Sequence, residues 1–104
     1  MKFAFSTNAY TNYNLIETIS DIAKIGYQGV EIMCDHPHAY PLSLDSKKIK
    51  DIKDEVYNNN IQISNLNAFT LFAIGDTYHP SWIEEDLSYR RLRINHTINC
   101  LYLL

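Results

Sequence analysis

The segment Cys34-Asp35-His36-Pro37-His38-Ala39-Tyr40-Pro41 holds the densest set of side chains that can do chemistry. It offers one carboxylate and two imidazoles together with two prolines, which stiffen the backbone. In an extended segment, His36 and His38 would face the same side and share a metal ion or a hydroxylated ligand. The alternative is that both are exposed loop residues or structural hydrogen-bond donors. Asp35 either orients one imidazole or caps the next turn.

Asparagine side chains form a second group of candidates. Asn8 follows the first apolar segment, and Asn65 and Asn67 alternate with Leu66, which predicts that the two amides share one face of a strand. Amides both donate and accept hydrogen bonds, so they suit the recognition of hydroxyl groups. Asn8, His36, His38 and Asn67 are therefore the predicted substrate-binding residues. The sequence identifies no catalytic residue and no metal ligand.

Other reactive or aromatic side chains have a weaker claim to function. Trp82, within Tyr78-His79-Pro80-Ser81-Trp82, either covers the apolar face of a ligand or packs its loop down, and we favour packing. His96 lies in a helical stretch, where a surface or interhelical role is expected. Cys34 and Cys100 belong to no CxxC pair and are expected to be reduced, buried thiols.

Strands and helices alternate along the chain and would position these groups. Asn14 and Asp45 are helix N-cap candidates followed by apolar residues at helical spacing, and Gly26 is suited to end the first helix. Gly29 is expected to let the chain turn tightly before the second strand. The expected elements are strands at 2–6, 30–33 and 61–66, helices between Asn14 and Gly26 and between Asp45 and Asn58, and a last helix from about 86. A long irregular connection is expected from about 69 to 85.

This order predicts an α/β fold with parallel strands, because each helix serves as a crossover between strands of one sheet. Three β-α units would leave one face of the sheet uncovered. The apolar ending Cys100-Leu101-Tyr102-Leu103-Leu104 has no residue that typically stops a helix, so the last helix is expected to run to the end of the chain. Both features indicate a fragment of a longer pattern; a small self-contained domain or a swapped oligomer is the alternative.

The segments Phe3-Ala4-Phe5-Ser6-Thr7-Asn8 and Gly26-Tyr27-Gln28-Gly29-Val30-Glu31-Ile32 resemble the start of xylose isomerase-like TIM barrels. The resemblance covers essentially the whole chain. It implies that residues 1–104 are the first three β-α units of a single (β/α)8 barrel domain. Within it, Glu31 is either a barrel-interior carboxylate paired with a neighbouring strand or a ligand-facing group.

The resemblance also implies a function. Intact relatives are expected to be sugar or sugar-phosphate isomerases or epimerases that use a divalent metal (Mn, Mg, Co or Zn) for proton transfer. Their metal ligands come from later strands, so this fragment is expected to bind no metal and to be inactive alone. The alternatives are an endonuclease IV-like zinc phosphodiesterase and an inactive fragment or interaction piece that self-associates through exposed sheet edges.

Composition limits the possible partners. A net charge of −3 and a pI near 5.7 argue against nucleic acid as a partner. The apolar runs are too short to cross a bilayer, so no membrane partner is expected. The start lacks a signal-peptide pattern, so a cytoplasmic location is expected. The sequence contains no P-loop, GxGxxG, GxSxG or HExxH motif.

Overall fold

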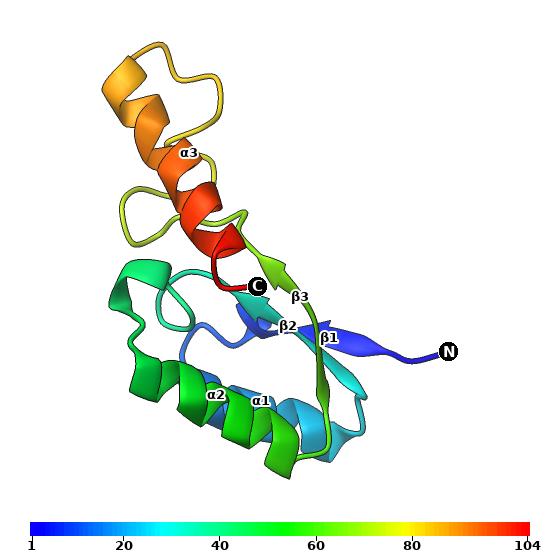
Figure 1. Ribbon diagram of the computed structural model, residues 1–104. Helices are drawn as coiled ribbons and strands as arrows, with labels where there is room; N and C mark the ends of the chain where they lie inside the picture. The colour runs from blue at the N-terminus through cyan, green and yellow to red at the C-terminus, as the bar shows by residue number, and fades with distance from the viewer.

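The computed structural model describes all residues, 1–104, and places three parallel strands in the order β1-β2-β3 (Figure 1). The α/β class and the parallel sheet predicted from the sequence are confirmed. The strands are β1 (Ala4–Ser6), β2 (Gly29–Met33) and β3 (Gln62–Asn67); the helices are α1 (Leu15–Ile25), α2 (Ser46–Asn58) and α3 (Leu87–Leu101); two short 3-10 helices are η1 (Thr7–Ala9) and η2 (Pro41–Ser43).

The predicted caps set the limits of the first two long helices. Asn14 Oδ1 accepts a hydrogen bond from the Glu17 amide at 2.8 Å, and Asp45 Oδ1 accepts one from the Lys48 amide at 2.8 Å. Each bond satisfies a backbone donor that has no partner within the first turn. Gly26 ends α1 in the left-handed conformation, with φ of 115°. Local sequence chemistry therefore decides where these two helices begin and where α1 ends.

Gly29 has a different role from the expected tight turn. It is the first residue of β2 and pairs with Ala4 of β1. A Cβ atom at Gly29 would lie 2.9 Å from the Cβ of Ala4 and 3.6 Å from the carbonyl oxygen of Gln62. Glycine is therefore required by close packing between strands rather than by backbone conformation.

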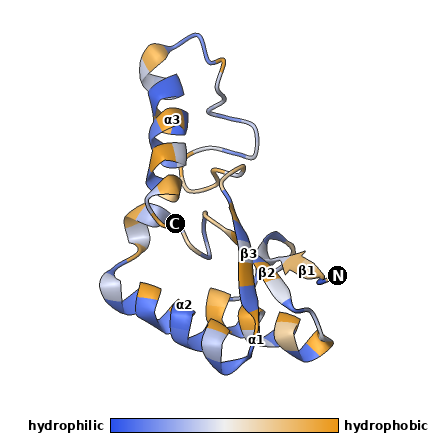
Figure 2. Ribbon diagram, turned by 45° about the vertical axis from the view of Figure 1, so that its right-hand side comes forward, coloured by the Kyte–Doolittle hydropathy of each residue, from blue (hydrophilic) through white to orange (hydrophobic).

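The hydrophobic core lies between the sheet and the two helices α1 and α2, which cover one face of it (Figure 2). Ile19 and Ile22 of α1 are completely buried against Val30 and Ile32 of β2. Apolar residues at helical spacing in α1 thus meet alternate residues of the central strand. Because Val30 and Ile32 of β2 point to the helices, the side chain of Glu31 between them points to the other face of the sheet.

The pairing of β2 with β3 contains a bulge. Val30 pairs with Ile63 but Glu31 pairs with Asn65, so that Ser64 is an extra residue in β3. If β3 paired regularly, Ser64 would lie opposite Glu31 and Asn65 opposite Ile32, so Asn65 would point to the helix side, because side chains alternate along a strand. The bulge therefore brings Asn65 to the same face as Glu31.

The second face of the sheet has no helix over it, and α3 extends away from the carboxyl end of β3 (Figures 1 and 2). It packs against η2 instead of lying beside α2. The helix ends at Leu101, and the expected continuation to Leu104 is wrong: the last residues form a turn with the Leu103 amide bonded to the Cys100 carbonyl. None of the helices combines the length and apolarity needed to span a bilayer.

Candidate functional site

A carboxylate and two amides meet on the open face of the sheet. Asn65 Nδ2 donates to Glu31 Oε1 at 2.6 Å, and Asn67 Nδ2 donates to Glu31 Oε2 at 3.3 Å. Glu31 lies on the central strand, and both asparagines come from β3. The predicted sharing of one face by Asn65 and Asn67 agrees with these bonds. Each oxygen of the carboxylate therefore accepts a side-chain amide from the neighbouring strand.

Two further hydrogen bonds fix the orientation of the asparagines. Ser64 Oγ donates to Asn65 Oδ1 at 2.7 Å, and the Phe69 amide donates to Asn67 Oδ1 at 2.9 Å. Since each amide oxygen is occupied by a donor, each NH₂ group is directed to Glu31. The cluster is thus preorganised on a rigid element, although Asn65 remains exposed to solvent and Glu31 is half-buried.

The surroundings keep Glu31 ionised. Partial burial acts to raise the pKa of its carboxyl group, but hydrogen bonds from Ser6, Asn65 and Asn67 outweigh burial and hold the pKa below its ordinary value. Ser6 is the last residue of β1 and pairs with Glu31. All three strands therefore contribute to one anionic, hydrogen-bonding patch, which we call the open-face cluster: Ser6, Glu31, Asn65 and Asn67.

His38 is used inside the structure. Its Nε2 lies 3.2 Å from the Tyr10 carbonyl and 3.1 Å from the Tyr13 carbonyl, so Nε2 must carry the proton and donate. Its Nδ1 then accepts from the Thr7 hydroxyl at 3.0 Å. The side chain is only 8% exposed, and burial lowers its pKa, with the two backbone bonds opposing that shift. Both ring nitrogens of His38 have a hydrogen-bond partner inside the protein, which agrees with the alternative that this histidine is a structural hydrogen-bonding residue.

His36 and Asp35 do not join His38 in a shared site. The His36 ring is exposed and lies against Tyr40, with 4.8 Å between ring centroids. Asp35 is fully buried and accepts from the backbone amides of His36, Phe72 and Ala73 at 2.8, 2.6 and 3.1 Å. It orients no imidazole; it ties the loop after β2 to the loop after β3. The predicted common side of the two histidines is therefore not formed.

The remaining candidates are distributed over the surface and the interior. Asn8 is exposed in η1, and its backbone amide donates to Ser6 Oγ at 3.3 Å, which places it beside the open-face cluster. Trp82 is 56% exposed, so the favoured packing role is not what the structure shows. His96 is not on the surface; it is buried beside Cys100 and Tyr40, where α3 packs against η2, which agrees with the interhelical alternative. Cys34 and Cys100 are free, buried thiols, as predicted.

Two important residues had no clear signal in the sequence. Arg93 is 4% exposed and donates to the carbonyls of Pro80, Ala68 and Phe69 at 2.8, 3.2 and 2.8 Å, so it secures the long loop to α3. Thr7 accepts from the Met33 amide at 2.9 Å and links β2 to His38. Both act through backbone groups distant in sequence. The bulge did have a signal in the sequence. The apolar residues Ile63 and Leu66 are three residues apart, whereas side chains on one face of a regular strand are two residues apart.

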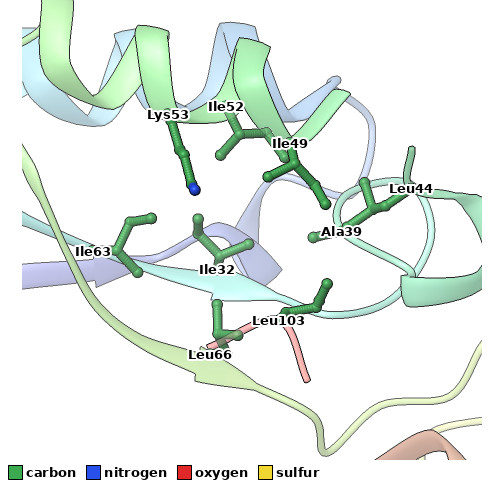
Figure 3. A pocket seen from close by; sticks show the side chains of 9 residues that line it. All are labelled: Ile32, Ala39, Leu44, Ile49, Ile52, Lys53, Ile63, Leu66 and Leu103. Atoms are coloured by element: carbon green, nitrogen blue, oxygen red, sulfur yellow. The ribbon is translucent and has the colours of Figure 1, made fainter. Parts of the chain in front are cut away.

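An apolar groove runs along the other side of β3, between the strand and α2 (Figure 3). Ile32, Ile63 and Leu66 line it from the sheet, and Ile49 and Ile52 line it from α2. Leu103 reaches back into it from the end of the chain. Its position, flanking α2 on the covered side of the sheet, is where a further helix could pack on this sheet.

The chain's own residues do not make a metal centre. No group of three or more His, Cys, Asp and Glu side chains is arranged to hold an ion. Glu31 is the one acidic side chain of the open-face cluster, and its companions there are amides and a hydroxyl. The divalent metal of the resembled family therefore does not fit this set of donors.

Comparison with known proteins adds no relative: no family model, no curated protein and no solved structure matches this chain. By its fold, the chain is an α/β protein with a three-stranded parallel sheet. The resemblance to xylose isomerase-like barrels stays a prediction.

Proposed function

We propose that the chain is an arc of a xylose isomerase-like (β/α)8 barrel and that its open-face cluster forms part of the wall of a sugar-binding cavity. The single observation that carries this proposal is the pairing of Glu31 with Asn65 and Asn67 on the face of the sheet opposite α1 and α2. In a barrel, that face points to the interior, and functional groups gather towards the carboxyl ends of the strands.

The strand order supports the barrel. Consecutive parallel strands with helices on one face are the repeating unit of a (β/α)8 barrel, whereas an open doubly wound sheet has helices on both faces. The apolar groove beside α2 supports it as well, because the next outer helix of a barrel would pack there. In the present structure α3 lies elsewhere, against η2.

The chemistry of the cluster suits binding better than proton transfer. A carboxylate whose pKa lies below the ordinary value is a weak base at neutral pH. It is, however, a strong acceptor for hydroxyl donors, and an asparagine can turn its amide towards a neighbouring hydroxyl. We assign Glu31 and Asn67 to the positioning of a sugar hydroxyl. Proton transfer on the sugar, assisted by a metal, belongs in this proposal to the rest of an intact isomerase or epimerase.

The binding test uses the purified chain and a panel of aldoses, ketoses and their phosphates. Saturation-transfer NMR should detect weak binding of at least one of them. Glu31→Gln should weaken it about tenfold or more, because a neutral amide replaces a charged acceptor. Glu17→Gln, on the exposed surface of α1, removes the same charge away from the cluster and should leave binding unchanged. Equal loss in both variants, or no binding across the panel, contradicts the proposal.

The activity test adds manganese and follows ketose epimerisation. The chain alone should show no turnover, because the cluster supplies neither a base of suitable pKa nor a metal centre. Turnover abolished by Glu31→Gln would overturn the division of roles between binding and catalysis.

A zinc phosphodiesterase of the endonuclease IV kind receives less support. The open face carries an ionised carboxylate and the chain has net charge −3, and both repel the phosphate backbone. Salt-sensitive binding to abasic DNA at nanomolar protein, in a gel-shift experiment, would favour this alternative over the sugar.

A further inference from the structure

A small hollow opens where α3 packs against η2. Its walls come from three segments that are distant in sequence: Tyr40, Pro41 and Leu42 at η2, Ile74 in the long loop, and one face of α3. The hollow encloses about 160 Å³, whereas pockets for drug-sized ligands usually enclose about 300 to 1,000 Å³. It shares no residue with the open-face cluster. The hollow is therefore a separate place on the molecule, with room for a ligand of a single ring.

One face of α3 turns three hydrogen-bonding side chains to this hollow. Asn95 and Asn99 are one helical turn apart, which places their Cβ atoms about 5 to 6 Å from each other, and His96 follows Asn95 directly. Asn95 is exposed, Asn99 is half-buried and His96 is only 4% exposed. The polar groups are thus distributed from the rim of the hollow to its interior.

Most of these groups are free of hydrogen bonds within the protein. Among the polar side chains around the hollow, only His96 makes such a contact, with Cys100 Sγ 3.7 Å from Nε2 and 4.0 Å from Nδ1. A sulfur atom is a weak partner, and one sulfur cannot satisfy both ring nitrogens. A buried imidazole nitrogen without a good partner is unfavourable unless a molecule in the hollow supplies one. The hollow is therefore lined with unused binding capacity.

The rest of the lining defines the chemistry of a matching ligand. No Asp, Glu, Lys or Arg side chain lines the hollow, so nothing there would compensate a charged ligand. Ile74 and Leu92 give it apolar surface, and the rings of Tyr40 and His96 lie side by side with 5.9 Å between their centroids. The hydroxyls of a sugar would lose their hydrogen bonds to water against this surface. A neutral, flat ring with apolar faces and a polar edge suits both parts of the lining.

The amides narrow the choice further. A carboxamide presents a carbonyl acceptor beside an NH₂ donor, and it can pair with the edge of a nucleobase through two parallel hydrogen bonds. A pyrimidine base carries N–H and C=O groups side by side on a single ring, and its faces pack well on aromatic side chains. Burial raises the pKa of Tyr40, so its hydroxyl keeps its proton at neutral pH and is a further donor.

We propose that the hollow between η2 and α3 binds a neutral pyrimidine base, with the Asn99 amide on the N–H and C=O edge of the ring and His96 at the inner end of the hollow. Asn95 contacts the outer edge of the same ring, and Leu92 packs on one of its faces. The ligand is the free base and not a nucleotide, because the hollow holds no cationic group for a phosphate and the chain has a net charge of −3.

The test titrates uracil into the native, isotope-labelled chain and follows the backbone amide signals by NMR. Saturable shifts should centre on residues around the hollow, such as Leu42, Ile74 and Asn99. Uracil methylated on both ring nitrogens keeps the ring but has no N–H donor, and should bind at least tenfold more weakly. The proposal is overturned by shifts centred elsewhere, by equal binding of the methylated ring, or by no saturable shift up to the solubility limit of uracil.

Matched variants test the role of the amides. Asn99→Leu has a similar size but no hydrogen-bonding group, and should weaken uracil binding about tenfold. Asn58→Leu makes the same replacement at an exposed position of α2, outside the hollow, and should leave binding unchanged. Equal affinities of these two variants would contradict the assignment. If Asn99→Leu fails to fold, Asn95→Leu at the exposed rim decides instead: a loss of about threefold supports the proposal, and unchanged affinity contradicts it.

Discussion

Thr7 shows how much one hydroxyl can contribute at the residue scale. Its oxygen accepts the Met33 amide, and its proton goes to His38 Nδ1, so one side chain joins η1, β2 and the loop after β2. The side chain is completely buried. Water cannot replace either bond if the hydroxyl is lost, and the cost is the desolvation of both partners.

We expect Thr7→Val, which keeps the shape but removes the hydroxyl, to lower the free energy of unfolding by about 2 to 3 kcal/mol. Thr7→Ser keeps the hydroxyl and should cost about 1 kcal/mol for the missing methyl group. Urea denaturation of the three proteins checks the order. A valine variant as stable as the serine variant would show that the bonds from this hydroxyl contribute nothing.

His38 should make stability depend on pH. Because burial lowers the pKa of the folded residue below 6.5, the unfolded chain binds a proton at a higher pH than the folded chain. Its contribution to stability is therefore complete above pH 6.5 and is lost as the pH falls through that value to the folded pKa. The urea midpoint should fall between about pH 7.5 and about pH 5.5. His38→Gln should flatten this part of the profile; an unchanged slope would assign the effect to other groups.

At the scale of elements, the contact between β1 and β2 depends on one glycine. The missing side chain of Gly29 allows Ala4 to approach, and a Cβ atom added at Gly29 would lie only 2.9 Å from the Ala4 Cβ. That atom is fixed to the backbone and cannot move aside without moving the strand. Replacement of Gly29 therefore tests strand pairing directly.

We expect Gly29→Ala to lower the free energy of unfolding by about 1 to 3 kcal/mol through overpacking. Ala4→Gly in the same chain removes the clashing atom and should restore part of the loss, which a double-mutant cycle measures. Gly26→Ala is a useful contrast, because it has open space but a φ of 115°, and Ala4→Gly should not rescue it. Additive losses for Gly29→Ala and Ala4→Gly would contradict direct contact.

Local elements were predictable because their signals are local. Asn14, Asp45 and Gly26 act on amides and carbonyls within a few residues, and their roles follow from the sequence. The role of His38 was not predictable, since its partners Thr7, Tyr10 and Tyr13 come from η1 and the segment that follows it, far away in the sequence. Asn67 was recognised on its strand, but its pairing with Glu31 depends on the register between strands, which alternation alone does not specify.

At the scale of the whole molecule, the open sheet and the outlying α3 give an elongated shape of 44 × 27 × 26 Å. β1 and β3 are edge strands, and apolar side chains such as Ile63 in the apolar groove remain exposed. Unpaired strand edges beside apolar surface favour association with a second copy. This observation supports the alternative of an interaction piece without catalysis.

We expect sedimentation velocity to show association that increases with protein concentration. Ile63→Lys should weaken it, because a charge would have to be buried at the edge of β3. Ile83→Lys adds the same charge in the long loop, where the side chain is 85% exposed, and should have little effect. A monomer at all concentrations, with a sharp thermal transition, would contradict this alternative.

The extra residue in β3 gives the strand one position at which its length can change without moving a side chain to the other face. Loss of Ser64 would leave Ile63 directly before Asn65, so the ladder with β2 would become regular while Leu66 stays on the side of the apolar groove and the amides on either side of it stay on the side of Glu31. A one-codon deletion at Ser64 should therefore be tolerated far better than a one-codon deletion inside β2, which has no extra residue and whose side chains beyond the deletion would change faces.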